Sequence, residues 1–130
     1  MKQINEICLI EDEPIPTFLA KKFIEKTGMV NLITEYHNGK EAYDALKLRC
    51  ENGESLPDFI FLDINMPIWD GWEFYEEFQK LPGNEAVKTY ILTSTLSDDD
   101  LQNAKEYGLM DRYLSKPLNF DKLKAIFEFD

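Results

Sequence analysis

Residues 59–63 read Phe-Ile-Phe-Leu-Asp, which is four consecutive apolar residues followed by a carboxylate. So short a run without a polar position is typical of a strand that is covered on both faces, as in a parallel sheet. The acid then stands at the carboxyl end of the strand. In open parallel sheets, ligands bind outside the carboxyl ends of the strands. Asp63 is therefore the first candidate for a functional residue.

Four more short runs, rich in β-branched or aromatic residues, flank this one along the chain. Together the predicted strands are Ile4–Ile10, Asn31–Tyr36, Phe59–Leu62, Thr89–Thr93 and Arg112–Ser115. Each is followed by a segment with helical features. Five βα units in a row favour an α/β fold in which helices cover both faces of a five-stranded, doubly wound parallel sheet.

The expected helices carry start and stop signals. The first should begin near Pro14 and end at Gly28, with an apolar side made of Phe18, Leu19, Phe23 and Ile24. Capping boxes are expected at Asn38 with Glu41 and at Ser97 with Asp100, and Asn119 is expected to cap the last helix. The apolar sides of the third and fourth helices are predicted to contain Trp72, Tyr75, Phe78, Leu101, Ala104 and Tyr107.

Composition narrows the class of protein. The chain has 130 residues, 25 acidic against 14 basic, and a net charge of −11, which disfavours direct binding to nucleic acid. It has no signal-peptide pattern and no stretch of membrane-spanning length. Its two cysteines, Cys8 and Cys50, have neither disulfide-framework nor metal-ligand spacing. We expect one cytoplasmic domain over residues 1–130, either free-standing or part of a larger protein.

Acids, a hydroxyl and an amine follow several of the predicted strands directly. Glu11 and Asp12 come after the first strand, Asp63 after the third, Thr93 at the end of the fourth and Lys116 after the fifth. The carboxyl ends of parallel strands share one edge of the sheet, so these side chains are expected to meet there. Clustered carboxylates repel one another, and a bound divalent cation relieves that repulsion. Oxygen-only ligands favour Mg²⁺.

Four motifs extend this pattern over nearly the whole chain. They are Ile-Glu-Asp-Glu-Pro at 10–14, Phe-Leu-Asp-Ile-Asn-Met-Pro-Ile-Trp-Asp-Gly at 61–71, Leu-Thr-Ser at 92–94 and Tyr-Leu-Ser-Lys-Pro at 113–117. In order and spacing they resemble the motifs of response-regulator receiver domains. The resemblance implies the flavodoxin-like sheet order 2-1-3-4-5.

The resemblance also implies a metal site. Asp12, Asp63 and the backbone carbonyl of Asn65 would contact Mg²⁺, and Glu11 would act through a water molecule. The family often has aspartate where Glu11 stands, which alters the reach of that carboxylate.

The roles implied for the remaining residues concern a phosphoryl group on Asp63. Lys116 would contact that group, turned into the site by a cis peptide at Pro117. Thr93 would donate a hydrogen bond to it, and Tyr113 would respond as a switch. The output would be a change in the face formed by the fourth helix, the fifth strand and the last helix.

The predicted function is that of a phosphoacceptor domain in a two-component phosphorelay. A histidine kinase or a histidine phosphotransfer protein would donate the phosphoryl group to Asp63, and a downstream protein would read the result. The chain would catalyse only its own phosphorylation and dephosphorylation, so it is not expected to be an enzyme. His37 follows a different strand from the acids and is not assigned to the site.

Three alternatives use the same fold. A phosphohydrolase with an aspartyl-phosphate intermediate needs a second acid two residues after the nucleophile, where this chain has Asn65. A flavin-binding module needs a loop that attracts phosphate, whereas residues 11–14 would repel it. A phosphorylation-independent interaction module remains open, although the intact set of acids, Thr93 and Lys116 disfavours it.

Overall fold

The apolar runs form one five-stranded parallel sheet in a computed structural model that describes residues 3–94, 96–116 and 118–129. The strands are β1 (Ile4–Ile10), β2 (Val30–Tyr36), β3 (Phe59–Asp63), β4 (Lys88–Thr93) and β5 (Tyr113–Ser115). Their order is β2-β1-β3-β4-β5 and every neighbouring pair is parallel. The predicted sheet and its order are therefore confirmed. β5 is one residue shorter than predicted, because it begins at Tyr113.

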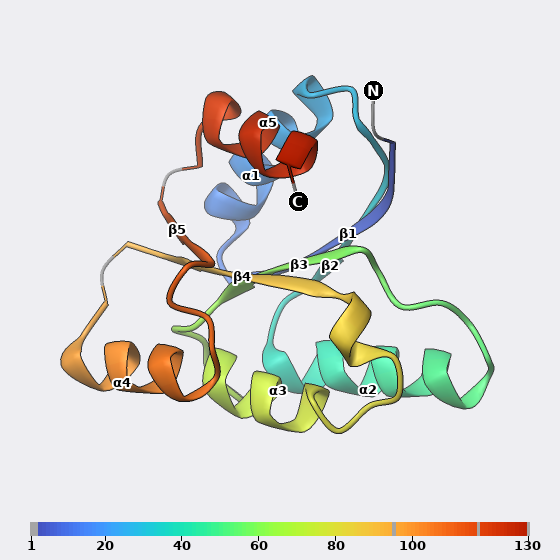
Figure 1. Cartoon of the computed structure of the whole chain (residues 1–130), viewed down its shortest axis with the longest axis vertical. Helices are drawn as coiled ribbons and strands as arrows, with labels where there is room; N and C mark the ends of the chain where they lie inside the picture. The colour runs from blue at the N-terminus through green and yellow to red at the C-terminus, as the bar shows by residue number, and fades with distance from the viewer. Residues whose placement is uncertain (1–2, 95, 117, 130) are drawn as a thin grey trace.

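Helices cover both faces of this sheet. They are α1 (Pro14–Lys26), α2 (Gly39–Glu51), α3 (Gly71–Phe78), α4 (Asp98–Glu106) and α5 (Phe120–Phe129), with a short 3₁₀ helix, η1 (Asn84–Ala86), before β4. α1 and α5 lie on one face, and α2, α3 and α4 lie on the other (Figure 1). No helix within the described ranges is long and apolar enough to cross a membrane.

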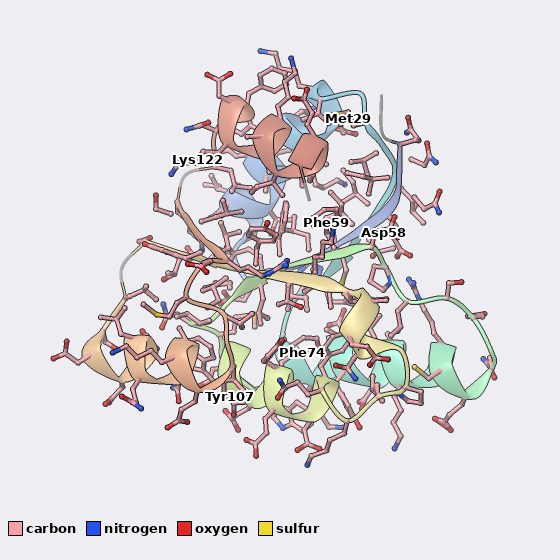
Figure 2. The ribbon with its side chains drawn as sticks, viewed as in Figure 1. Met29, Asp58, Phe59, Phe74, Tyr107 and Lys122 are labelled. Carbon is pink, nitrogen blue, oxygen red and sulfur yellow. The ribbon has the colours of Figure 1, made fainter. Side chains whose placement is uncertain are left out.

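The central strand β3 contributes to the core on both faces. Phe59 and Phe61 pack with the residues of α1 and α5, while Ile60 and Leu62 pack with those of α2 and α3. In Figure 2 the labelled Phe59 accordingly lies on the α5 side of the sheet and Phe74 of α3 on the opposite side. All five residues of β3 are buried, which explains why its sequence has no polar position before Asp63.

The predicted caps of α2 and α4 differ in completeness. At α4, the Ser97 side chain accepts from the Asp100 backbone and the Asp100 side chain accepts in return, so the capping box is present. At α2, the Asn38 side chain accepts from the Glu41 backbone at 2.8 Å, and no return bond is found for that described pair. Both helices nevertheless begin where the sequence predicts.

The buried side of α1 was predicted only in part: Ile24 is buried and Phe23 packs against the core, as expected. Phe18 and Leu19 are exposed, at 59% and 42%, whereas Thr17, Ala20 and Ile24 are buried. The apolar residues of this helix occupy too much of its circumference for their spacing to identify the inner side. The small side chains of Thr17 and Ala20 allow close approach to the sheet and leave the bulky pair facing outward.

Candidate functional site

The predicted site lies at the carboxyl edge of the three central strands. β1 and β3 are neighbours in register, Ile10 opposite Leu62, so the residues that follow them emerge side by side. On the other side of β3, Asp63 pairs with Leu92, the residue before Thr93. The parallel register therefore brings together residues that are far apart in the sequence.

Glu11, Asp12 and Asp63 form a compact group of carboxylates. One oxygen from each lies within 4.8 Å of the others. Glu11 and Asp63 are 1% exposed, and Asp12 is half-buried. Oδ1 of Asp12 has no hydrogen-bond donor among the described residues, and Oε1 of Glu11 and Oδ2 of Asp63 have none there besides the ammonium group of Lys116. Buried carboxylate oxygens without donors are suited to a cation.

Lys116 supplies a positive charge to this group. Its Nζ lies 2.5 Å from Oε1 of Glu11 and 3.4 Å from Oδ2 of Asp63. The Lys116 backbone N–H donates to the carbonyl of Thr93 at 3.0 Å, which fixes the start of the side chain at the end of β5. Burial favours the neutral amine, but the contacts with Glu11 and Asp63 outweigh it and raise the pKa of Lys116.

Glu11 is the most perturbed acid of the site. Burial, followed by its hydrogen bond and repulsion with Asp63, raises the pKa of Glu11 to about 8, and the contact with Lys116 opposes that rise only in part. In the metal-free protein the raised pKa favours protonation of this carboxylate near neutral pH.

Asn65 links the acids to the threonine. Its backbone N–H donates to Oδ1 of Asp63 at 3.0 Å, and its side-chain Nδ2 donates to Oγ1 of Thr93 at 3.3 Å. Thr93 is 1% exposed. The predicted phosphoacceptor, metal-site and threonine residues are therefore gathered at one place.

The loop after Asp63 has an unusual backbone that motif reasoning did not reveal. Ile68 and Trp69 have positive φ angles of 50° and 62°, a region that side chains rarely adopt. The Gly39 backbone N–H donates to the Trp69 carbonyl at 3.2 Å, and a Cβ on Gly39 would lie 2.6 Å from that oxygen. The Trp69 ring packs on Tyr43 of α2 with ring centroids 5.3 Å apart. The start of α2 thus supports this loop.

A cavity of 340 Å³ adjoins the lysine. It is lined by Glu13, Pro16, Leu19, Ala20, Leu92, Ser94, Lys116 and Leu118. On the same helix, the side chains of Ile15 and Phe18 are exposed. Motif reasoning did not predict this cavity, since it only placed Phe18 and Leu19 with Phe23 and Ile24 on one apolar side of the helix.

Of three other residues discussed in the sequence analysis, two lie apart from the acids and one lies outside the described residues. Tyr113 is 36% exposed on β5, which is compatible with a side chain directed outward. His37 is exposed after the edge strand β2. Pro117, for which a cis peptide was predicted, lies outside the described residues.

Comparison with known proteins gives one family. Residues 7–128 match the model of the response regulator receiver domain. The probable methanogenesis regulatory protein FilR2 of Methanothrix harundinacea is 34% identical over 122 residues, which cover 94% of this chain and 78% of that protein. A two-component response regulator from Cytophaga hutchinsonii superimposes with a TM-score of 0.84 at 29% identity, covering 98% and 96% of the two chains.

A third similarity concerns the fold alone. The receiver domain of the sensor histidine kinase PA1611 from Pseudomonas aeruginosa, solved with a magnesium ion coordinated in its active site cleft, is 24% identical with a TM-score of 0.78. The coverage is 98% of this chain and 96% of that one. Together with the family match and the sheet order, these similarities show that the chain belongs to the response regulator receiver domain family.

Proposed function

We propose that residues 1–130 form one receiver domain that accepts a phosphoryl group on Asp63 from a phosphohistidine donor. The observation that carries the proposal is the position of the Asp63 carboxylate. It is buried at the end of β3, within 4.8 Å of two other acids and 3.4 Å from an ammonium group. Buried carboxylates with a purely structural role are not usually crowded in this way.

The acids fit a magnesium ion. Asp12, Asp63 and the backbone carbonyl of Asn65 would hold it directly, and Glu11 would act through water. The donor set is all oxygen, and one buried oxygen of each acid is free of any described partner other than Lys116, which suits a cation. When bound, Mg²⁺ neutralises negative charge on the transferred phosphoryl group.

Asp63 acts as the nucleophile. A carboxylate oxygen of Asp63 attacks phosphorus, a P–O bond forms, and the P–N bond to the donor imidazole breaks with its electron pair left on nitrogen. The Asn65 backbone N–H orients the carboxylate through its 3.0 Å hydrogen bond. Lys116 and the Thr93 hydroxyl then stabilise the phosphoryl oxygens.

The donor is a histidine kinase or a histidine phosphotransfer protein that docks on α1. Leu19 lines the cavity that Lys116 also lines, so apolar surface reaches the edge of the reacting group. Ile15 and Phe18, 73% and 59% exposed, are further apolar side chains that α1 offers to a donor protein. We place the protein in the cytoplasm, because Cys8 and Cys50 are free thiols, as is usual in a reducing compartment.

Phosphorylation is read as a change in the face of α4, β5 and α5. A phosphoryl group of roughly −1.5 to −2 charges draws in the Thr93 hydroxyl, and the Tyr113 ring on the neighbouring strand moves toward the space left behind. A downstream protein binds the altered face. Hydrolysis of other phosphoesters is not favoured, because Asn65 offers an amide where a phosphohydrolase has its second acid.

Acetyl phosphate with Mg²⁺ tests the acceptor. Intact-mass spectrometry is expected to show addition of one base-labile phosphoryl group to the wild type and none to Asp63→Asn. Asp111→Asn, at an exposed position, is the matched control and should label normally. Undiminished labelling of Asp63→Asn would require another acceptor.

A second arm tests the docking surface. Phe18→Ala is expected to label normally with acetyl phosphate, because a small donor needs no protein surface. The same variant should label more slowly from a purified phosphohistidine protein. Equal rates from both donors would remove α1 from the proposal while leaving Asp63 in place.

A further inference from the structure

The helix α4 has little buried surface of its own. Among its nine residues only Ala104 is buried. Ile64, Trp72, Ile91 and Leu109 surround Ala104 and form the small apolar cluster on which α4 rests. Because burial of apolar area is the main source of stability, a helix attached by one alanine depends on its other contacts for its position.

Trp72 of α3 provides a polar contact to the first turn of α4. Its indole Nε1–H donates to Oδ1 of Asp100 at 2.9 Å. The other oxygen of Asp100 accepts from the Ser97 backbone at 3.2 Å, and the Asp100 backbone donates to the Ser97 hydroxyl at 3.1 Å. Burial acts to raise the pKa of Asp100, but the bonds from Trp72 and Ser97 lower it, so the carboxylate is a charged acceptor. The tryptophan is therefore hydrogen-bonded to Asp100, the capping-box partner of the cap residue Ser97.

The same indole contacts the last turn of α4. The ring of Tyr107, just after α4, stacks on Trp72 at a centroid distance of 6.0 Å and an interplanar angle of 13°. Tyr75 meets the edge of Tyr107 at 5.5 Å. Figure 2 labels Tyr107 at the end of α4 that lies beside α3. One side chain of α3 thus holds α4 at both ends.

The start of α3, which carries Trp72, lies against the end of β3, which carries the phosphoacceptor. Its neighbour Gly71 donates its backbone N–H to the carbonyl of Ile64, the residue directly after Asp63, at 3.2 Å. A Cβ on Gly71 would lie 2.6 Å from the Ile64 Cα, so these backbone segments are in direct contact. The start of α3 is therefore attached to the end of β3 as well as to α4.

We propose that Trp72, through Asp100 and Tyr107, is a clamp that holds α4 in its resting position and opposes the phosphorylation switch. The statement that this clamp opposes the phosphorylation switch rests on the proposed function. Thr93 stands four residues before the α4 cap Ser97. If Thr93 moves toward a phosphoryl group, it pulls Ser97 and the start of α4 with it. The hydrogen bond from Trp72 to Asp100 resists that movement. The clamp therefore favours the unphosphorylated arrangement.

Trp72→Phe tests the clamp in the full chain, because it keeps an aromatic ring at this position and removes the N–H donor. Amide exchange in α4 of the free protein is expected to become about threefold faster or more, since loss of a hydrogen bond to a charged group weakens the local attachment. The apparent affinity for beryllofluoride with Mg²⁺ is expected to rise about threefold to tenfold, because the resting state loses a contact that the active state lacks. Tyr107→Leu, which removes the stacking contact instead, should change both quantities in the same direction.

Trp69→Phe is the matched control, because it removes the indole N–H of the only other tryptophan and leaves the clamp intact. It should leave α4 exchange unchanged. In this variant Trp72 is the sole tryptophan, and its emission should shift to longer wavelength when beryllofluoride binds. Unchanged exchange and affinity in both Trp72→Phe and Tyr107→Leu, or weaker affinity in either, would overturn the proposal. If the wild type failed to bind beryllofluoride, the proposed function would fall, while α4 exchange would still decide whether the clamp exists.

Discussion

Asp63→Asn is expected to stabilise the metal-free protein, although it removes the proposed acceptor. Asp63 is buried with Glu11 and Asp12 within 4.8 Å. Asparagine has nearly the same shape, carries no charge and keeps an oxygen for the Asn65 N–H. The substitution therefore removes like-charge repulsion with little change in packing.

The magnitude follows from the distances. Two full charges at the 4.8 Å limit repel by about 3.5 kcal/mol at an effective dielectric constant of roughly 20, so two acids repel Asp63 by about 7 kcal/mol. The attraction between Asp63 and Lys116, 3.4 Å apart, offsets about 5 kcal/mol of this repulsion at the same effective dielectric constant. Protonation of Glu11 relieves part of the excess repulsion, and desolvation of Asp63 adds to the cost of its charge. We expect a gain of about 1 to 2 kcal/mol in the free energy of unfolding.

The pH dependence has a definite sign. The pKa of Glu11 is raised from its ordinary 4.5 to about 8, so the folded state binds more protons than the unfolded state between those values. The stability contributed by this group is present below the ordinary pKa and is lost as pH rises toward 8. Wild-type stability in EDTA should therefore fall across this range. Asp63→Asn should flatten the slope, because it removes one cause of the raised pKa.

Urea unfolding in EDTA and in excess Mg²⁺ measures these effects, with free energies from linear extrapolation. Mg²⁺ should stabilise the wild type and have much less effect on Asp63→Asn, because a ligand stabilises only the state that binds it. Asp111→Asn, at an exposed site, is the control for loss of a negative charge. A variant less stable than wild type in EDTA, or equally stabilised by Mg²⁺, would refute the crowding argument.

Three other substitutions or probes test the surroundings of the site. Lys116→Ala should retain Mg²⁺ binding but lose most labelling by acetyl phosphate. In the absence of metal, its free energy of unfolding should fall by about 3 kcal/mol, because buried carboxylates lose their counterion. Labelling and stability equal to those of the wild type would remove the lysine from the site. Gly39→Ala should destabilise by about 1 to 3 kcal/mol, because its Cβ would lie 2.6 Å from the Trp69 carbonyl oxygen; an unchanged urea midpoint would show that the loop yields. Cys8 should resist iodoacetamide in the folded protein while half-buried Cys50 reacts, because burial raises the pKa of the Cys8 thiol to about 12; equal labelling in peptide maps would contradict its burial.

The sheet and the acids were predictable because each signal is local. β3 is buried on both faces, so its sequence contains no polar residue until Asp63. Glu11 and Asp12 likewise follow an apolar strand directly. Once the strands are parallel, the ends meet at one edge without further information. Local sequence and topology therefore suffice to assemble the acidic group.

The buried side of α1 and the contacts of Trp72 were not predictable in the same way. Periodicity could not choose between the bulky residues of α1 and the small pair Thr17 and Ala20, since both arrangements have helical spacing. Trp72 was expected only to pack, because its partner Asp100 is 28 positions away on another helix. Contacts of this kind depend on how two helices are placed on the sheet, which short-range patterns do not determine.

The charge state of the site likewise depends on distances that motifs do not contain. From the sequence, Lys116 is a partner for the phosphoryl group on Asp63. In the structure it lies nearer to Glu11, at 2.5 Å, than to Asp63, at 3.4 Å. With the raised pKa of Glu11 favouring its protonation near neutral pH, one ammonium group and one proton offset two of the three negative charges in the metal-free site. A divalent cation supplies the same two positive charges. Its binding is therefore expected to displace the Glu11 proton and to free Lys116 from Glu11, so the lysine becomes available to a phosphoryl group when the site is otherwise ready for transfer.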